Sequence, residues 1–229
     1  MSDLHDRWVE ERRHEYYYKL AKKLNYRSRA SFKLIQIDER FGIFKEGDSV
    51  VDLGACPGGW CQVAKERTWP NGHVIGVDLR YIHPLEGVDF IIGDITEDAT
   101  MIRLLEMVGG KVDVVLSDMA PNIAGHYSTD HARSIELCTY AVDVCDRILK
   151  KNGKLAMKVF MGDMFGMLEK QLKSRFRHVT VTSPAASRPT SSEVYVVCTG
   201  FLAAHNVEPV REIKQEKEAP AFRPKGGNI

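Results

Sequence analysis

From residue 48 onward, short apolar runs alternate with longer stretches of helical character, and this alternation constrains the fold more than any other feature of the chain. Each run holds about four to seven residues and is rich in β-branched side chains, as in SVVDLG and HVIGVDL. Continuous apolar runs of this length are typical of strands buried on both faces, which occur mainly in parallel sheets. The order therefore predicts an α/β fold with a doubly wound, mostly parallel sheet.

The last two predicted strands depart from this alternation, because no helix separates them. We expect residues 178–184 and 191–201 to be antiparallel neighbours, which would give the sheet an antiparallel edge strand. The longest predicted helix covers residues 130–152, with Gly153 in the position of a C-cap glycine. The other predicted strands are 49–54, 73–79, 88–94, 112–121 and 153–160, and the other predicted helices are 59–69, 96–108 and 164–176.

The 229 residues fit one domain with a short appendage, and 44% apolar residues suffice for a substantial core. We expect a folded domain over residues 1–205, with a basic helical segment at about residues 7–40, and a flexible polar tail over residues 206–229. The chain shows neither an apolar signal segment nor a membrane-length apolar run, which predicts a cytoplasmic protein. Five cysteines without a C-x-x-C pair predict free thiols rather than a zinc site.

The loop after the first predicted strand, Gly54-Ala55-Cys56-Pro57-Gly58-Gly59-Trp60, is rich in glycine, which allows a ligand to approach the backbone closely. It is not a G-x-G-x-x-G loop. Pro57 also removes an amide that a dinucleotide pyrophosphate would use, so NAD is disfavoured.

Acidic residues follow the next two predicted strands. Asp78 ends the second strand, where a carboxylate can accept hydrogen bonds from both hydroxyls of an adenosine ribose. Asp94 and Ile95 follow the third, where a carboxylate and an apolar side chain can hold an adenine. Taken singly, each aspartate could equally be a loop or helix cap. Together with the glycine loop they resemble a site for S-adenosylmethionine, with contacts from Gly54, Pro57, Gly58, Gly59, Trp60, Asp78, Asp94 and Ile95.

Four further charged residues occupy informative positions. Lys33 closes RSRASFK before the first strand, Asp118 follows the run VDVVLS, and Glu193 opens EVYVV. Lys158 lies inside the otherwise apolar strand GKLAMKVF, where an unpaired ammonium would be costly. It can be a snorkelling lysine, a member of a structural ion pair, or a lysine tuned for proton transfer.

With their flanks, these residues resemble the FtsJ/RrmJ family of RNA ribose 2′-O-methyltransferases. The matching stretches are RSRASFKL, VDLGACPGGW, VDFIIGDI, SDMAPNIAG, KVF and SRPTSSEVYVV, in the family order over residues 27–197. The resemblance implies a Rossmann-like methyltransferase fold, S-adenosylmethionine as cofactor and no metal. It implies a catalytic tetrad of Lys33, Asp118, Lys158 and Glu193, and it adds Asp118 to the cofactor contacts. Cys56 departs from the family, where alanine is common.

Methylation of a ribose requires that the 2′-hydroxyl lose or share its proton. We expect Lys158, transiently neutral, to accept this proton, and Lys33 to hydrogen-bond the 2′-oxygen. Asp118 would orient Lys158, and Glu193 would position Lys33 or the ribose. If Lys158 instead stays charged, it would stabilise the developing alkoxide, and the sequence leaves both possibilities open.

The net charge is only +1, but the basic residues are concentrated in two segments. Residues 16–33 hold six Lys or Arg and no acid, and residues 170–192 hold five and no acid. Interleaved aromatics in the first segment favour one electropositive, RNA-binding face that flanks the site, although both segments could be solvated helix faces. The candidate RNA contacts are Lys22, Lys23, Arg27, Arg29, Lys173, Arg175 and Arg188.

The resemblance implies ribosomal RNA as the partner, within the large subunit and with uridine as the expected target, and it implies no membrane and no obligate protein partner. A tRNA ribose methyltransferase is the alternative enzyme. A small-molecule or protein methyltransferase would explain the glycine loop but not the second lysine or the basic segment. A catalytically silent RNA-binding subunit would explain the basic segments but not an intact tetrad.

Overall fold

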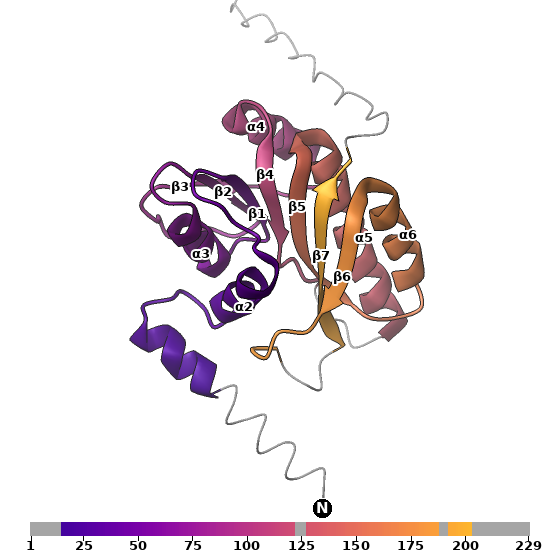
Figure 1. Cartoon of the computed structure of the whole chain (residues 1–229), viewed down its shortest axis with the longest axis horizontal. Coiled ribbons are helices and arrows are strands. Elements are labelled where there is room, and N and C mark those ends of the chain that lie inside the picture. Colours follow the sequence, from indigo (N-terminus) through magenta and orange to yellow (C-terminus); the bar gives the residue numbers. More distant parts are fainter. Residues whose placement is uncertain (1–14, 122–126, 188–191, 203–229) are drawn as a thin grey trace, which may run out of the picture.

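The structure, a computed structural model, describes residues 15–121, 127–187 and 192–202. Within these residues the strands form one seven-stranded sheet in the order β3-β2-β1-β4-β5-β7-β6 (Figure 1). The strands are β1 Ser49–Leu53, β2 His73–Asp78, β3 Val88–Ile92, β4 Val112–Ser117, β5 Leu149–Phe160, β6 Phe176–Thr182 and β7 Glu193–Phe201. The helices are α2 Ser31–Phe41, α3 Gly59–Thr68, α4 Asp98–Val108, α5 Tyr127–Ile148 and α6 Phe165–Arg175, and residues 15–23 are helical as well.

The predicted fold is confirmed. β1 pairs in parallel with β2 on one side and β4 on the other, so the chain builds the sheet outward from β1 in both directions. In such sheets a crevice opens outside the carboxyl ends of the strands at this switch point. The antiparallel strand is β7, which lies between β5 and the edge strand β6 and pairs with both. The predicted antiparallel pairing of the last two strands is therefore present.

Helices cover both faces of the sheet, and each face has its own core. α2 and α3 pack on one face through apolar residues that include Leu34 and Val63. α4, α5 and α6 pack on the other face, with Leu104, Ile148 and Leu172 among the buried residues. β1, β2 and β4 are buried from both sides, as their continuous apolar runs predicted. The prediction is wrong for β3, an edge strand of the sheet in which Asp89 and Ile92 are exposed.

The end of α5 differs from the prediction. The helix stops at Ile148 rather than Asn152, because Leu149 already pairs with Val112 of β4. The pairing register then shifts before Val114, and the left-handed residue in this irregular stretch is Asn152, with φ 65°. Gly153 is therefore not a C-cap glycine. Asparagine adopts positive φ at little cost, which suits it to a bulge of this kind.

Some predictions fall on residues that the structure does not describe. The tail over residues 206–229 and the first residues of the basic segment are among them. The five cysteines are free, and four of them are buried. Among the described residues, no helix combines the length and the apolar character that crossing a membrane requires.

Candidate active site

The sheet register brings the four tetrad residues together at the carboxyl edge of the parallel strands. Met157 of β5 pairs with Ser117 of β4, so the next residues along these strands, Lys158 and Asp118, lie side by side. β7 runs antiparallel, so its first residues meet the end of β5, and Glu193 pairs with Phe160. The fourth residue, Lys33, comes from α2, which covers this end of the sheet (Figure 1).

Two lysine–carboxylate pairs form the centre of the site. Lys158 Nζ lies 3.1 Å from Asp118 Oδ1 and donates a hydrogen bond to the Asp118 backbone oxygen at 2.7 Å. Lys33 Nζ donates to Glu193 Oε1. The two lysines are only 7–8% exposed. Buried ammonium groups are tolerated only with hydrogen-bonded partners of opposite charge, so each carboxylate holds its lysine in place.

Tyr195 joins the two pairs, and sequence reasoning missed it. Its hydroxyl accepts a hydrogen bond from Lys33 Nζ at 3.0 Å and lies 3.1 Å from both Asp118 Oδ1 and Glu193 Oε1. A phenol has one proton, so it can donate to only one carboxylate at a time. Tyr195 follows Glu193 by two residues and therefore shares its face of β7, a spacing that could have identified it.

The charges at the centre hold Glu193 ionised and Tyr195 protonated. Burial alone would raise the pKa of Glu193, but the charge and hydrogen bond of Lys33 outweigh it, and the pKa lies below its usual value. Burial, followed by the negative charges of Asp118 and Glu193, holds the pKa of Tyr195 well above its usual value. Tyr195 is therefore a neutral bridge between the two ion pairs rather than a base.

The glycine loop lies between β1 and α3 and is fastened to the end of β2. The amides of Gly54 and Ala55 donate to the Val77 carbonyl, and the Cys56 amide donates to Asp78 Oδ2 at 2.9 Å. Gly54 has φ 75°, and a Cβ there would lie 2.8 Å from Met119 Cγ, so only glycine fits. The loop thus closely approaches the residue after Asp118.

Asp78 keeps capacity for a ligand. Its Oδ1 accepts the Arg80 amide at 2.8 Å and lies 3.4 Å from Arg80 Nε, and its Oδ2 accepts the Cys56 amide. A carboxylate has about four acceptor positions, so this largely buried group keeps acceptor capacity on Oδ2.

Of the two residues predicted to hold the adenine, Asp94 has an oxygen available and Ile95 is buried. Asp94 Oδ1 accepts both the amide and the hydroxyl of Thr96, as a loop cap would, while its second oxygen takes no hydrogen bond within the described chain. Ile95 belongs to the core and is only 8% exposed, so it offers little surface to a ligand. Leu79, directly after Asp78, is 67% exposed, and Ile92 at the end of β3 is 51% exposed, so both offer apolar surface on this edge. The run HVIGVDL already contained Leu79 as an apolar residue beyond the aspartate.

The side chain of Trp60 has a structural role. The indole is buried and packs against the Tyr195 ring, with 5.8 Å between ring centroids, and its Nε1 donates to the Ala30 carbonyl. It therefore holds the start of α2, and with it Lys33, against the sheet. The predicted cofactor contact can come only from its backbone, at the start of α3.

Asp52, which sequence reasoning did not single out, lies fully buried beneath the glycine loop. Its Oδ2 accepts a hydrogen bond from the Cys61 thiol at 3.1 Å, and its Oδ1 has no hydrogen-bond partner among the described residues. Burial raises the pKa of Asp52 to about 7, and the negative charges of Asp118 and Asp78 act in the same direction.

The basic N-terminal segment divides into exposed and structural residues. Lys22 and Lys23 are exposed and available to a polyanion, whereas Arg27 and Arg29 are half-buried. Tyr17 and Tyr26 both pack on Phe32 and so fix the helix at residues 15–23 to α2. Of the interleaved aromatics, only Tyr16 and Tyr18 stay largely exposed.

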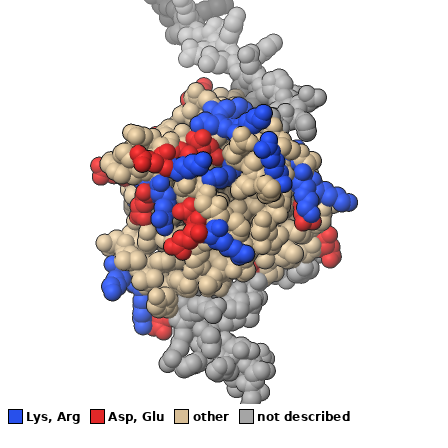
Figure 2. Space-filling view, in the orientation of Figure 1, with Lys and Arg blue, Asp and Glu red and all other residues tan. Residues whose placement is uncertain are grey.

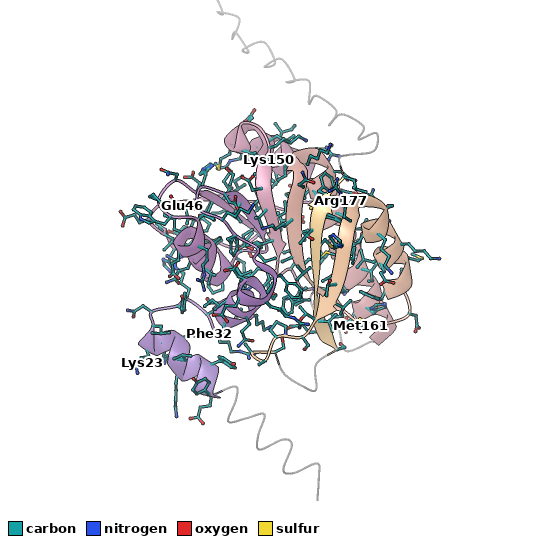
Figure 3. The ribbon with its side chains drawn as sticks, in the orientation of Figure 1. Lys23, Phe32, Glu46, Lys150, Met161 and Arg177 are labelled. Carbon is teal, nitrogen blue, oxygen red and sulfur yellow. The ribbon has the colours of Figure 1, made fainter. Side chains whose placement is uncertain are left out.

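The two candidate RNA contacts on α6, Lys173 and Arg175, lie away from the site. Lys173 and Arg175 precede Phe176 at the start of β6, while the site lies near the other end of that strand, where Thr182 pairs with Tyr195. Six residues of strand separate these ends, about 20 Å. Figure 3 shows Arg177 and Met161 at opposite ends of the sheet.

Both of these residues of α6 have acidic partners within the fold. Arg175 pairs with Asp146 of α5 at 2.8 Å, and Lys173 pairs with Glu169 on its own helix. Arg188 lies outside the described residues. α2 and α6 also lie on opposite faces of the sheet, and Figure 2 shows basic and acidic side chains mixed on the visible face. The exposed lysines of the N-terminal helix and the basic residues of α6 therefore do not share one face of the sheet.

Comparisons with known proteins agree with this geometry. Residues 26–201 match the model of the FtsJ-like methyltransferase family. A relative from Methanosarcina acetivorans, named ribosomal RNA large subunit methyltransferase E, is 53% identical over 84% of this chain and 70% of its own length. Relatives of the same name from Methanocaldococcus jannaschii and Methanobrevibacter smithii are 48% and 46% identical, over 85% and 87% of this chain and 82% and 96% of their own lengths.

A solved structure supports the same assignment. The crystal structure of a ribosomal RNA methyltransferase from Plasmodium falciparum superposes with a TM-score of 0.71 and 34% identity, covering 78% of this chain and all of that one. The matched region contains the glycine loop, both lysine–carboxylate pairs and Tyr195. The chain therefore belongs to the FtsJ-like methyltransferase family, whose methyl donor is S-adenosylmethionine.

Proposed function

We propose that this methyltransferase transfers a methyl group to a ribose 2′-hydroxyl, with uridine as the expected target, in large-subunit ribosomal RNA. The observation that carries the proposal is the pair of buried lysine–carboxylate contacts, joined by Tyr195 and placed at the switch point beside the glycine loop. The names of the relatives support the substrate class. Action on this RNA would place the protein in the cytoplasm.

The residues around the glycine loop fit S-adenosylmethionine. Asp78 Oδ2 keeps an acceptor position for a ribose hydroxyl, Asp94 has a second oxygen for the adenine edge, and Leu79 offers an exposed apolar face. α3 begins at Gly59 without a side-chain cap, so its first amides are oriented toward an anion such as the methionine carboxylate. When bound, the cofactor supplies a methyl group already activated by its sulfonium.

The hydrogen bonds of Lys158 suit a proton acceptor. A neutral amine has two N–H donors and one lone pair. Asp118 provides two acceptors, its backbone oxygen and Oδ1, which take both donors and leave the lone pair for the proton of the 2′-hydroxyl. In the charged form the third N–H would instead point at the developing alkoxide. Both forms place the same nitrogen at the reacting oxygen.

Lys33 and Tyr195 complete the arrangement. Lys33 donates one N–H to Glu193 and one to the Tyr195 hydroxyl, which leaves the third N–H for the 2′-oxygen. Because Tyr195 stays protonated, it can donate to Asp118 and hold the carboxylate that orients Lys158. Much of the rate would come from this fixed positioning of the ribose oxygen.

The substrate is tested by incubating the purified chain with methyl-labelled S-adenosylmethionine and, separately, large-subunit rRNA, tRNA and protein. Label in rRNA that resists alkaline cleavage at one nucleotide supports the proposal, because a 2′-O-methyl group blocks hydrolysis there. Label in tRNA alone would support the alternative enzyme. RNA binding without any transfer would indicate a silent subunit.

The variant Lys158→Ala tests, in the same assay, the role of Lys158 as proton acceptor. Loss of the proton acceptor should lower the rate of transfer by about a hundredfold to ten-thousandfold. Cofactor affinity, measured by calorimetry, should stay near the wild-type value, because Lys158 is not assigned to the cofactor pocket. Substantial turnover by this variant would contradict the assigned role.

A further inference from the structure

Arg27 is one of the predicted RNA contacts, but its guanidinium donates hydrogen bonds to backbone carbonyls around the glycine loop. Nη1 donates to the His83 carbonyl at 2.5 Å and to the Pro57 carbonyl at 3.4 Å, and Nη2 donates to the Pro84 carbonyl at 2.6 Å. These carbonyls belong to two separate segments, the loop after β1 and the segment after β2.

The guanidinium also fills the space that Gly58 leaves open. Gly58 has φ 103°, and a Cβ at this position would lie 2.9 Å from Arg27 Nη1. The absence of a side chain at Gly58 therefore serves the contact with Arg27 as well as the left-handed turn into α3.

The chain around Arg27 runs along α3 and reinforces the contact. The Arg27 amide donates to Gln62 Oε1, and Gln62 Nε2 donates to the Asn25 carbonyl. Nearby, the Tyr26 hydroxyl donates to Glu66 Oε2, and Ser31 Oγ donates to the Gly59 carbonyl. Residues 25–31 are thus bound to both the loop and the helix that follows it.

The two segments that Arg27 joins stand on either side of Asp78. Asp78 is the last residue of β2, and it holds the Cys56 amide from the loop and the Arg80 amide from the following segment. Arginine presents several N–H groups in a fixed planar fork, so Arg27 reaches carbonyls of both segments from two nitrogens, whereas a lysine ammonium would present all its donors from one atom.

We propose that Arg27 is a positioning residue for the cofactor: it fixes the loop after β1 against the segment after β2 in the geometry that receives the adenosine ribose at Asp78. It does not bind an RNA phosphate. This assignment rests on the proposed use of the glycine loop and Asp78 as the cofactor site.

The test compares Arg27→Lys and Arg27→Met with Lys23→Met, an exposed lysine of the same basic segment. Calorimetry gives the dissociation constant for S-adenosylmethionine, filter binding gives the one for rRNA, and hydrogen exchange without cofactor reports the amides of residues 54–59. Each is measured well below the unfolding temperature of the variant, so that a loss of global stability does not enter.

Both Arg27 variants should raise the cofactor dissociation constant by about tenfold or more, since charge-assisted hydrogen bonds are lost. They should also speed exchange in residues 54–59. Lys23→Met should do neither. RNA affinity should fall no more in Arg27→Met than in Lys23→Met, because both variants remove one positive charge. Arg27→Lys keeps the charge and remains informative if Arg27→Met fails to fold.

Wild-type cofactor affinity in both Arg27 variants would overturn the inference. A selective loss of RNA affinity in Arg27→Met, with cofactor affinity intact, would return Arg27 to the RNA surface. If the wild-type chain itself does not bind S-adenosylmethionine, the proposed function fails and this inference fails with it. The wild-type titration therefore separates the two failures.

Discussion

Among single residues, Tyr195 has the greatest effect on how the site works, because its one hydroxyl touches three charged groups. Lys33 donates to it, and Asp118 and Glu193 both lie within hydrogen-bond distance of it. The pair of Lys33 with Glu193 joins α2 to β7, and the pair of Lys158 with Asp118 joins β5 to the end of β4, so this hydroxyl links two ion pairs held by different elements.

Tyr195→Phe should lower kcat by about tenfold while leaving the KM for the cofactor unchanged, because the hydrogen bonds of the hydroxyl to Lys33 and to a carboxylate are lost and the ring is kept. The ring keeps its contact with Trp60, so the free energy of unfolding should fall by no more than about 1–3 kcal/mol, the cost of the lost buried hydrogen bonds. Steady-state kinetics and calorimetric unfolding check both expectations. A variant with wild-type kcat would show that the two ion pairs act independently.

Asp52 gives the chain a pH dependence of stability that can be isolated by mutation. Its pKa is about 7 in the folded protein and 3.8 in the unfolded reference, so the folded state holds the proton more tightly. The stability it contributes is fully present below pH 3.8 and is lost as the pH rises through 7. The lowered pKa of Glu193 gives a pH dependence of stability in the opposite direction, but Glu193 is present both in the wild type and in Asp52→Asn.

Asp52→Asn should therefore become more stable relative to wild type as the pH rises from about 4 to 7. The free-energy difference between the two should grow by at most about 1.4 kcal/mol per pH unit and then level off. Urea unfolding of both proteins across this range measures it, and Glu193 cancels in the comparison. Parallel stability curves would show that Asp52 is already ionised in the folded state.

Among the elements, α6 carries a basic residue, Arg175, that was predicted to contact RNA but instead contacts another helix. Arg175 Nε lies 2.8 Å from Asp146 Oδ2, and Asp146 is buried on α5. The contact joins two helices on the face of the sheet away from α2. The charge of Arg175 therefore stabilises the fold.

Arg175→Met should lower the free energy of unfolding by about 1–3 kcal/mol, because the buried Asp146 carboxylate loses its partner. The range lies below that of a fully buried pair, since Arg175 is partly exposed to solvent. Urea unfolding measures the loss, and rRNA affinity of the folded variant should stay unchanged. A stable variant with weak RNA binding would restore the original prediction.

The regular elements were predictable from sequence where one local pattern decided them. Apolar runs located the strands, and the antiparallel pairing of β6 with β7 followed from the missing helix between them. The end of α5 was not predictable, because the pairing of Leu149 with Val112 stops the helix and that contact is remote in the chain.

The site shows the same division. Lys33, Asp118, Lys158 and Glu193 were identified by their motifs, and the expected pairs of Lys158 with Asp118 and of Lys33 with Glu193 are present. The link between the pairs through Tyr195 was not predicted, because it depends on the register of β5 with β4 and β7. Charge density alone could not separate Arg27, which bonds to three carbonyls, from Lys23, which is exposed. Both carry a positive charge in the same segment, and only packing distinguishes them.

At the scale of the whole molecule, the exposed lysines near the N-terminal helix remain as the RNA-facing charges. Lys22 and Lys23 are exposed, and Lys22 stacks over the exposed Tyr18 ring at 4.6 Å. α2 links this helix to Lys33 of the site. The arrangement suits contacts to phosphates next to a ribose held in the crevice.

Reversing Lys22 and Lys23 to glutamate should raise the KM for RNA and reduce the slope of log affinity against log salt by about one to two. Cofactor affinity should stay unchanged, since Arg27 is intact. Reversing Lys170 and Lys173 on α6 changes the net charge equally and should have a smaller effect. A salt titration of RNA binding compares the two. Equal effects would show that RNA responds only to net charge.

The place of β7 in the sheet has a consequence for the protein while it is being synthesised. β7 is the last strand along the described chain, yet it lies between β5 and β6, and β6 joins the sheet only by pairing with it. A chain emerges from the ribosome amino terminus first. Until residues 193–201 are available, the nascent sheet has a gap with two unpaired edges, which are templates for association with other chains.

The active-site residues Glu193 and Tyr195 belong to that same strand, β7. Closing the sheet and completing the active site are therefore the same late event, and a nascent chain cannot methylate RNA before it has finished folding.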